Sequence, residues 1–442
     1  MELGIMTVAV VNLWNKKIGA VAWDESRRCG NFEYEEDFVR SRIELAPLMM
    51  PLKKNRIYSF PTLAWDTFHG LPGMLADSLP DKFGTALINA WLAKEGRSPD
   101  SMNPVERLCY IGNRGMGGLE FFPEIGPKKS KSNVIYVDKL VELASEILTQ
   151  RADFSVSIED KEKTEALRDI LRVGTSAGGA RAKAVIAWNP STNEVRSGQI
   201  ETEDGFSYWI LKFDGVSGNK DKELEDPKGY GLIEYAYSKM AAKAGIKMSE
   251  CRILEEGGRK HFMTKRFDRT DGGEKIHMQS LCAMAHYDFN MAKAYSYEQA
   301  IGVMKKLDLT MDEIEEQFRR MVFNVVCRNQ DDHVKNIAFL MNKAGEWSLS
   351  PAFDVTYAYN PLGKWTGQHQ MSINGKTDDF KVEDFEACAN TASLKRGRDK
   401  DILEQVQTAA KEWPNIAQEV GIPSETIEQV GKAHRFFKIK VS

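Results

Sequence analysis

The chain has 442 residues, 42% hydrophobic and 28% charged, so it can bury a large core and form two or three domains. A formal net charge of −4 excludes a protein that coats nucleic acid over its whole surface. The apolar runs are too short for a membrane span, and the six cysteines include no CxxC pair. Because no basic region followed by an apolar stretch opens the sequence, we expect a cytoplasmic protein with reduced thiols.

The N-terminal part predicts strands and turns followed by a helix. Short apolar runs bounded by Gly, Asn and Pro indicate β-strands at residues 8–13, 18–23 and 56–60. Residues 74–95 are expected to form one helix, with Asp77-Ser78-Leu79-Pro80 in or near its first turns and Gly96 as its end. The segment Gly126-Pro127-Lys128-Lys129-Ser130-Lys131-Ser132 has the composition of a linker, so we expect an N-terminal subdomain to end at residue 126.

Two segments are rich in glycine. Residues 112–118 lack the G-x-G-x-x-G spacing and follow a helical stretch, so we assign them no dinucleotide. Residues 174–179 come after helical stretches at about 135–171 and precede Lys183 and a strand at 184–188. Glycines let backbone N–H groups approach a phosphate, and Lys183 adds a positive charge. Ala180 stands where a P-loop NTPase requires Lys, so a phosphate loop of another kind and a flexible interdomain turn both fit.

Lys212 lies late in an otherwise apolar strand, residues 206–213. A lysine flanked by apolar residues must find an anion or extend its amine to water. In a nucleotide cleft, ATP phosphates would supply the anion. Lys212 is therefore a second candidate for phosphate binding, with a solvated amine as the alternative.

The C-terminal half predicts a helix, a hairpin and then mainly helices. Asp226-Pro227 opens a helix that Gly245 closes. Residues 251–254 and 261–267 alternate like the two strands of a hairpin. From about residue 297 helices dominate, and Thr310–Glu313 matches a capping box. The apolar face of that helix extends to Val326, so the helix leads the chain directly into a polar loop around Asp331.

The polar loop is followed by a second predicted hairpin. Asn336 opens an apolar run at 337–341, residues 342–346 supply a turn, and residues 347–349 indicate a return strand. An antiparallel hairpin brings its two open ends together. We therefore expect Asn336 and Asp354 to lie side by side, with Asp331 one short loop away.

These three side chains suit phosphoryl transfer from ATP. An Asp accepts the proton of the attacking hydroxyl, while an Asn and an Asp hold the magnesium that bridges the phosphates. A polar loop with solvated carboxylates is one alternative. A hydrolytic zinc site of His333 with Asp331 or Asp332 is another, but no third His or Cys lies nearby in the sequence.

Strands first and helices afterwards indicate a bilobal α+β fold like that of protein kinases, with a mainly β N-terminal subdomain and a mainly helical C-terminal lobe. We expect three units. The first, residues 1–126, is the N-terminal subdomain. Residues 133–296 would carry the phosphate loop and hinge, and residues 297–442 the catalytic loop.

Together these motifs resemble the HipA family of bacterial serine/threonine kinases, the toxins of type II toxin–antitoxin pairs, over nearly the whole chain. Asp77-Ser78-Leu79-Pro80-Asp81 resembles the signature of the family's N-terminal subdomain. Residues 178–183 resemble its phosphate loop, and Asn329-x-Asp331-x-His333-x-Lys335-Asn336 resembles its catalytic loop. Phe353-Asp354 stands where the family has its second metal-binding Asp.

The resemblance implies that Asp331 is the catalytic base and that Asn336 and Asp354 bind Mg²⁺. It implies that residues 265–267 form a hinge that contacts adenine largely through its backbone, although the family often carries Glu where Lys265 stands. Ser176 matches the family's autophosphorylated serine, with Thr175 as a rival acceptor. The implied ATP site consists of Gly178, Gly179, Ala180, Arg181, Ala182, Lys183, Lys212, Lys265, Arg266, Phe267, His333, Lys335, Asn336 and Asp354.

The resemblance also implies partners. These are a small HipB-like helix-turn-helix antitoxin, DNA bound mainly through that antitoxin, and a protein substrate such as an aminoacyl-tRNA synthetase, glutamyl-tRNA synthetase for the best-known members. Direct contacts with DNA would involve Lys395, Arg396 and Arg398. The alternatives are a catalytically weak corepressor that acts with the antitoxin on DNA, and a small-molecule kinase of similar fold.

Overall fold

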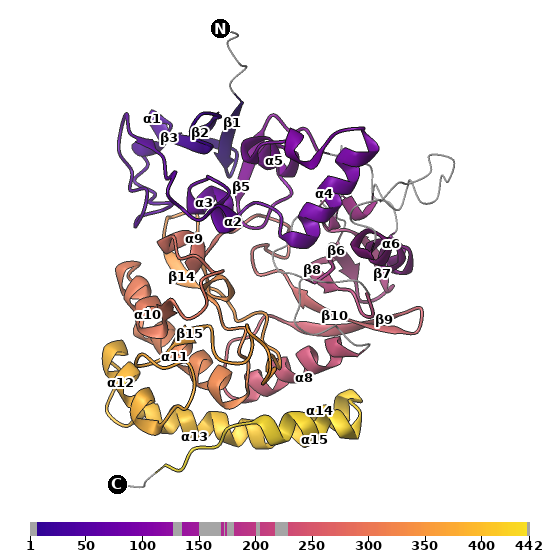
Figure 1. Cartoon of the computed structure of the whole chain (residues 1–442), viewed down its shortest axis with the longest axis vertical. Coiled ribbons are helices and arrows are strands. Elements are labelled where there is room, and N and C mark those ends of the chain that lie inside the picture. Colours follow the sequence, from indigo (N-terminus) through magenta and orange to yellow (C-terminus); the bar gives the residue numbers. More distant parts are fainter. Residues whose placement is uncertain are drawn as a thin grey trace.

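The computed structural model describes residues 7–126, 135–149, 169–171, 173–174, 181–199, 204–216 and 229–439. In these residues the chain forms an N-terminal sheet, a second sheet and a helical lobe (Figure 1). The predicted α+β, kinase-like class is confirmed, with helices concentrated in the last third of the chain. No helix of the described ranges is both long and apolar enough to cross a membrane.

Five antiparallel strands form the N-terminal sheet in the order β4-β3-β2-β1-β5. Burial alternates along β1, as expected for a sheet with one face on the core. The predicted strands at 8–13 and 18–23 are confirmed, while 56–60 yields only two strand residues. The third strand was not predicted, because only Phe32 and Tyr34 mark its buried face. The strands are β1 (Val8–Leu13), β2 (Lys16–Asp24), β3 (Cys29–Tyr34), β4 (Ile57–Tyr58) and β5 (Leu119–Phe122).

The single helix predicted at 74–95 is wrong, since the chain forms α3 (Gly73–Ala76), a break, and then α4 (Lys82–Lys94). Pro80 explains the break, because proline disfavours helical backbone in the residue before it. Asp81 then begins the new helix as its N-cap, with Oδ1 accepting a hydrogen bond from Gly84 N at 2.7 Å. The other short or medium helices of this part are α1 (Glu36–Val39), α2 (Trp65–Phe68) and α5 (Pro104–Ile111).

The second sheet is also antiparallel, with strand order β7-β6-β8-β10-β9. Helix α4 and helix α6 (Val137–Thr149) share a core with it, and Leu87 of α4 and Ile186 of the sheet belong to the same buried cluster. Helix α8 (Tyr230–Lys243) packs against β9 and β10, and Gly245 follows it with a φ of 83°. Its predicted opening at Asp226-Pro227 lies outside the described residues. The strands are β6 (Lys183–Asn189), β7 (Glu194–Ser197), β8 (Ser207–Lys212), β9 (Cys251–Glu256) and β10 (Arg259–Lys265).

The predicted hairpin after the polar loop is confirmed. Strands β13 (Ala338–Met341) and β14 (Trp347–Leu349) pair antiparallel, and β11 (His277–Ser280) pairs with the other edge of β13. A further short pair joins β12 (Tyr295–Ser296) to β15 (Met371–Ser372) in parallel. At the open end of the hairpin, Ser350 N donates to Ala338 O at 3.0 Å. The chain segments that carry Asn336 and Asp354 therefore leave the hairpin from the same end.

Helices complete the C-terminal lobe, most of them below the hairpin in the view of Figure 1. The predicted capping box at Thr310 is confirmed, with Thr310 accepting from Glu313 N and the Glu313 side chain from Thr310 N. The predicted apolar face of the helix that follows Thr310 is buried in the core. The polar loop therefore begins where this buried helix ends. The helices are α9 (Leu281–Ala285), α10 (Tyr297–Lys306), α11 (Met311–Val326), α12 (Val382–Ala392), α13 (Arg398–Lys411), α14 (Trp413–Val420) and α15 (Ser424–Ala433).

Candidate active site

The loop after α11 exposes one of its two neighbouring carboxylates and buries the other. The Asp331 side chain is 45% exposed, whereas Asp332 is buried. Asp332 accepts hydrogen bonds from Tyr297 Oη at 2.7 Å and Gln370 N at 2.8 Å, and lies 2.8 Å from His369 Nδ1. Asp332 therefore has a structural role, because it connects the loop to Tyr297, His369 and Gln370. Asp331 is the carboxylate that a substrate can reach.

Asn336 closes the same loop. Its Nδ2 donates to the backbone oxygen of Asp331 at 2.8 Å. Because the amide nitrogen is used in this way, Oδ1 is the atom of the Asn336 side chain that is left to accept a hydrogen bond or bind a cation. The loop thus ties a neutral oxygen ligand to the backbone of Asp331.

A buried lysine joins two carboxylates in what we call the ionic centre, formed by Lys212, Glu234 and Asp354. Lys212 Nζ lies 2.5 Å from Glu234 Oε1 and also contacts Asp354 Oδ1. Burial alone would lower the pKa of Lys212, but attraction to Asp354 and Glu234 outweighs burial and raises it. The lysine is therefore charged, and it connects β8, α8 and the segment after β14.

Asp354 is held in an uncommon backbone conformation with a φ of 53°, in the left-handed region that Asp tolerates better than most residues. Burial alone would raise its pKa. The cations Lys212 and Lys183, with a smaller electrostatic contribution from the His333 ring, reverse that effect and lower the pKa to about 2. The side chain stays 32% exposed, so an ionised oxygen ligand faces the site.

Glu234 was not predicted as a site residue. It lies on α8, is buried, and its Oε2 accepts from Arg181 Nη1 at 3.0 Å while Oε1 binds Lys212. A strand lysine paired with a helix glutamate is the arrangement that kinases use to hold the phosphate-binding lysine. The only local signal was a lone carboxylate among apolar residues of a predicted helix, and no spacing rule connects it to Lys212.

The described end of the predicted phosphate loop makes a second buried ion pair. Lys183 Nζ lies 3.1 Å from Asp81 Oδ2, and both side chains are almost fully buried. Burial raises the pKa of Asp81 and lowers that of Lys183, while their mutual attraction opposes both shifts. Ala182 is buried beside them. Thr175, Ser176, Gly178, Gly179 and Ala180 lie outside the described residues.

The predicted hinge directs its charged side chains away from one another. Lys265 Nζ pairs with Asp271 at 2.7 Å. The Arg266 guanidinium is fully buried and donates two hydrogen bonds to Asp268, whose Oδ2 also accepts from Gly117 N at 2.7 Å. Phe267 lies 5.5 Å from Phe353 between ring centroids. The charged groups of 265 and 266 are thus engaged. Lys265 N and Arg266 N also donate to Glu250 O and Tyr208 O, and Lys265 O accepts from Ser249 Oγ. In the described hinge this leaves the Arg266 carbonyl, the Phe267 backbone and the Phe267 ring for a ligand.

Two further predicted residues border Asp331. His333 Nε2 lies 3.8 Å from Asp331 Oδ1, and its ring lies beside those of Phe289 and Trp365. Lys335 Nζ lies 5.1 Å from the centre of the Phe289 ring. Its positive charge also favours the ionised form of Asp81. Trp365, which the sequence did not indicate, donates from Nε1 to Asp331 Oδ1 at 2.7 Å. The predicted residues from four separate segments therefore share one electrostatic environment.

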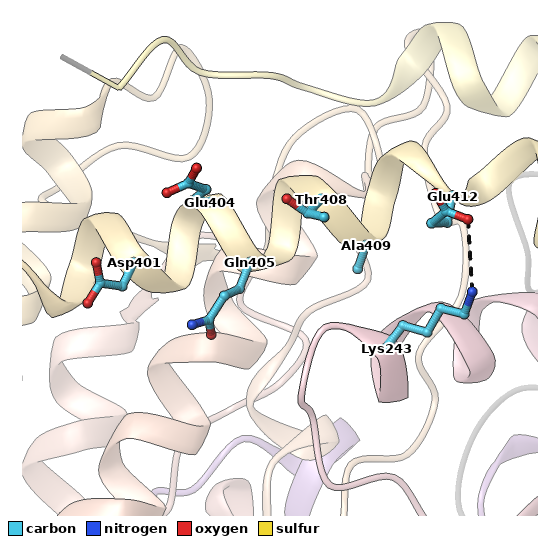
Figure 2. Close-up of a pocket in the computed structure, with 7 residues that line it drawn as sticks. All are labelled: Lys243, Asp401, Glu404, Gln405, Thr408, Ala409 and Glu412. Carbon is cyan, nitrogen blue, oxygen red and sulfur yellow. Dashed lines mark ion pairs between the residues drawn. The ribbon is translucent and has the colours of Figure 1, made fainter. Parts of the chain in front are cut away.

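The basic segment 395–400 lies apart from this group. Lys395 and Arg396 are exposed, but Arg398 makes a two-point ion pair with Glu315 of α11 at 2.9 and 2.7 Å. A surface depression between α8 and α13 (Figure 2) likewise shares no residue with the group. Its lining includes three carboxylates and one lysine, and consists of Lys243, Asp401, Glu404, Gln405, Thr408, Ala409 and Glu412.

The residues present fit a magnesium–nucleotide pair. Magnesium prefers hard oxygen ligands and keeps several waters, so the carboxylate of Asp354 and Oδ1 of Asn336 form a suitable protein contribution. Lys212 supplies the adjacent positive charge. The zinc alternative finds no support, because no group of three or more His, Cys, Asp or Glu in the described ranges could hold a metal ion.

A sheet with a lysine–glutamate pair, set against a helical lobe with an Asp/Asn loop, defines a protein of kinase-type fold. The chain belongs to the HipA family. Residues 175–413, more than half of the chain, match the HipA-like C-terminal domain, and residues 9–122 match the HipA N-terminal domain. The resemblance seen in the sequence is thereby confirmed.

Two of the solved structures that are similar to this chain illustrate the likeness. One is a chain of the Shewanella oneidensis MR-1 toxin–antitoxin complex of HipA, HipB and operator DNA, at 17% identity and a TM-score of 0.64, with 96% of this chain and 94% of that chain covered. The other is the proinflammatory kinase CtkA of Helicobacter pylori, at 13% identity and a TM-score of 0.37, with 58% and 90% covered. The first likeness shows the fold.

The buried pair of Asp81 and Lys183 yields a stability prediction. Asp81→Asn retains a good N-cap for α4 but removes the carboxylate partner of Lys183, so we expect the free energy of unfolding to fall by about 3 kcal/mol. Urea unfolding followed by tryptophan fluorescence measures the change.

Asp37→Asn is the matched control, because Asp37 is 86% exposed and its ion pair with Arg40 contributes little. Adding Lys183→Met to Asp81→Asn removes both charges and should restore most of the lost stability. A single variant as stable as the control would contradict a structural role for this pair.

Proposed function

We propose that this chain is an ATP- and Mg²⁺-dependent protein serine/threonine kinase and the toxin of a toxin–antitoxin pair. The observation that carries the proposal is the ionic centre, in which Lys212 binds Glu234 and Asp354, and Asp354 is electrostatically coupled to His333 of the loop that carries Asp331 and Asn336. Phosphoryl transfer depends mainly on positioning and charge stabilisation, which is what a charged lysine, a metal ligand and an exposed base provide. Membership of the HipA family supports the same function.

Each residue has a distinct proposed role. Asp331 accepts the proton of the attacking hydroxyl, and its exposure allows the hydroxyl to belong to a protein. Asn336 and Asp354 hold Mg²⁺, which neutralises phosphate charge when bound. With the cation bound, Asp354 would give up its contact with Lys212, and Lys212, kept in place by Glu234, would supply its positive charge to the phosphates.

The remaining predicted residues would surround the nucleotide. We propose that residues 178–183 cover the phosphates, that His333 and Lys335 border them, and that residues 265–267 contact adenine through their backbone. The described cations support a binding site for an anion, because Lys183 and Lys212 pair across β6 and β8, Arg181 lies two residues before Lys183, and Lys183 acts electrostatically on Asp354. The units 1–126, 133–296 and 297–442 remain our proposed division of the chain.

We also propose that autophosphorylation of Ser176 limits the activity. A phosphoserine adds about two negative charges. In a loop that precedes Arg181 and Lys183, these charges would compete with ATP for the same cations and repel its phosphates. Phosphorylation would therefore weaken nucleotide binding rather than alter the acceptor side of the site.

For partners we propose a HipB-like helix-turn-helix antitoxin in the cytoplasm, with DNA bound mainly through it, and an aminoacyl-tRNA synthetase such as glutamyl-tRNA synthetase as substrate. The similar solved chain was crystallised with HipB and operator DNA, which supports this class of partner. Lys395 and Arg396 are exposed and could meet a phosphate. Arg398 is a weaker candidate because Glu315 already binds it.

Asp331→Asn tests the reaction. Replacing the carboxylate by an amide removes the proton acceptor but keeps the size of the side chain, so transfer of labelled phosphate from ATP to protein should fall by about 10²- to 10⁴-fold. Nucleotide affinity and thermal unfolding serve as controls and should stay within error of the wild type. Transfer at the wild-type rate would reject the proposal. A wild-type protein without kinase activity, together with operator binding that Asp331→Asn leaves unchanged, would favour the corepressor.

Ser176→Ala tests self-limitation, with Thr175→Ala as the neighbouring control. We expect the serine variant to incorporate no label into itself and to keep its affinity for ATP after incubation, because no negative charge enters the loop. The threonine variant should modify itself like the wild type. Mass spectrometry of the loop peptide reads the result, and a phosphate found on Thr175 alone would overturn the assignment of Ser176.

A further inference from the structure

An indole N–H is bound to the carboxylate that we propose as the base. Trp365 Nε1 donates to Asp331 Oδ1 at 2.7 Å, a short and therefore strong contact with a charged acceptor. His333 is the other polar side chain near this oxygen, but its Nε2 lies 3.8 Å away, beyond hydrogen-bond distance. Among the described residues, Trp365 is thus the side chain that fixes the orientation of the Asp331 carboxylate.

The segment that carries Trp365 is itself fixed to the loop of Asp331. Gln370 Nε2 donates to the backbone oxygen of Trp365 and lies 3.4 Å from that of Gln330. Gln370 N donates to Asp332 Oδ1 at 2.8 Å. Further upstream, Gln330 N donates to Ala358 O at 3.1 Å. The two segments are therefore joined by hydrogen bonds on both sides of Trp365, two through side chains of Gln370 and Asp332 and one between backbone groups, and these contacts anchor the segment that carries the indole.

The chemistry of indole suits positioning. Its N–H can only donate, so Trp365 can neither take nor return the proton that a base accepts. A carboxylate has two oxygens, and an indole bound to Oδ1 leaves Oδ2 for a hydroxyl. Asp331 remains 45% exposed with the indole in place, so the tryptophan does not close off the carboxylate.

We propose that Trp365 is a positioning residue for phosphoryl transfer, which holds Asp331 so that its second oxygen faces the acceptor hydroxyl. This inference rests on the proposed kinase function and adds a residue to its acceptor side. Trp365 contacts Asp331 through its indole N–H and has no part in the ionic centre. Its loss should therefore slow transfer and leave nucleotide binding unchanged.

Trp365→Phe is the test, because it retains an aromatic ring and removes the N–H. The probe is labelled ATP with Mg²⁺. The measured quantity is the single-turnover rate of phosphate incorporation into the full-length chain at a series of ATP concentrations. We expect the maximal rate to fall about tenfold, since small misplacement of a reacting group costs one to two orders of magnitude. The ATP concentration for half-maximal rate should stay within about twofold, as expected for a change that spares nucleotide binding.

Trp347→Phe is the matched control. It also removes an indole N–H that makes one hydrogen bond, from Nε1 to Glu44 O at 3.2 Å, but at a position outside the site. It should leave both kinetic quantities at their wild-type values, while thermal unfolding reports any loss of stability in either variant. A general structural effect of removing an indole would slow both variants alike.

An unchanged maximal rate in Trp365→Phe would overturn the positioning role, and so would a faster rate, which would mean that the indole obstructs the acceptor. Asp331→Asn is measured in parallel to separate the two levels of the argument. If Asp331→Asn is inactive and Trp365→Phe is not slowed, the positioning role alone fails. If Asp331→Asn transfers phosphate at the wild-type rate, both the positioning role and the proposed kinase function fail.

Discussion

The need to pair a buried lysine determines how the site is assembled. Lys212 lies on a strand among apolar residues, and moving its charge out of water costs several kcal/mol unless close carboxylates compensate. Glu234 from α8 and Asp354 from the segment after β14 supply that compensation. Three stretches of chain that are distant in sequence are thereby brought to one point, and the left-handed backbone at Asp354 is held there by the same contacts.

The same rule joins the N-terminal subdomain to the site. Asp81 pairs with Lys183 at the start of β6, and Asp77 accepts hydrogen bonds from the backbone and hydroxyl of Ser280. Asp268 connects Arg266 of the hinge to Gly117. Because these contacts involve buried charges, displacing the subdomain would leave Asp81 and Lys183 without each other near the proposed nucleotide site. In the proposed kinase, the subdomain would hold the predicted phosphate loop and hinge in register.

Local patterns in the sequence predicted local structure well. The hairpin after Asn336, the capping box at Thr310 and the first two strands follow from spacing and turn residues alone. The helix at 74–95 failed because an apolar pattern continued across Pro80 and hid the new N-cap at Asp81. Glu234 and Trp365 were missed for another reason: each is recognised only by its partner, 22 and 34 residues away, and no periodicity connects such pairs.

The central claim is that the ionic centre and the Asp331 loop form one nucleotide site. A crystal structure with Mg²⁺ and a non-hydrolysable ATP analogue tests it most directly. The account predicts a metal ion bound by Asn336 and Asp354, with Lys212 moved from Asp354 to a phosphate and still paired with Glu234. A nucleotide bound elsewhere, or phosphates that leave the contact of Lys212 with Asp354 intact, would contradict it.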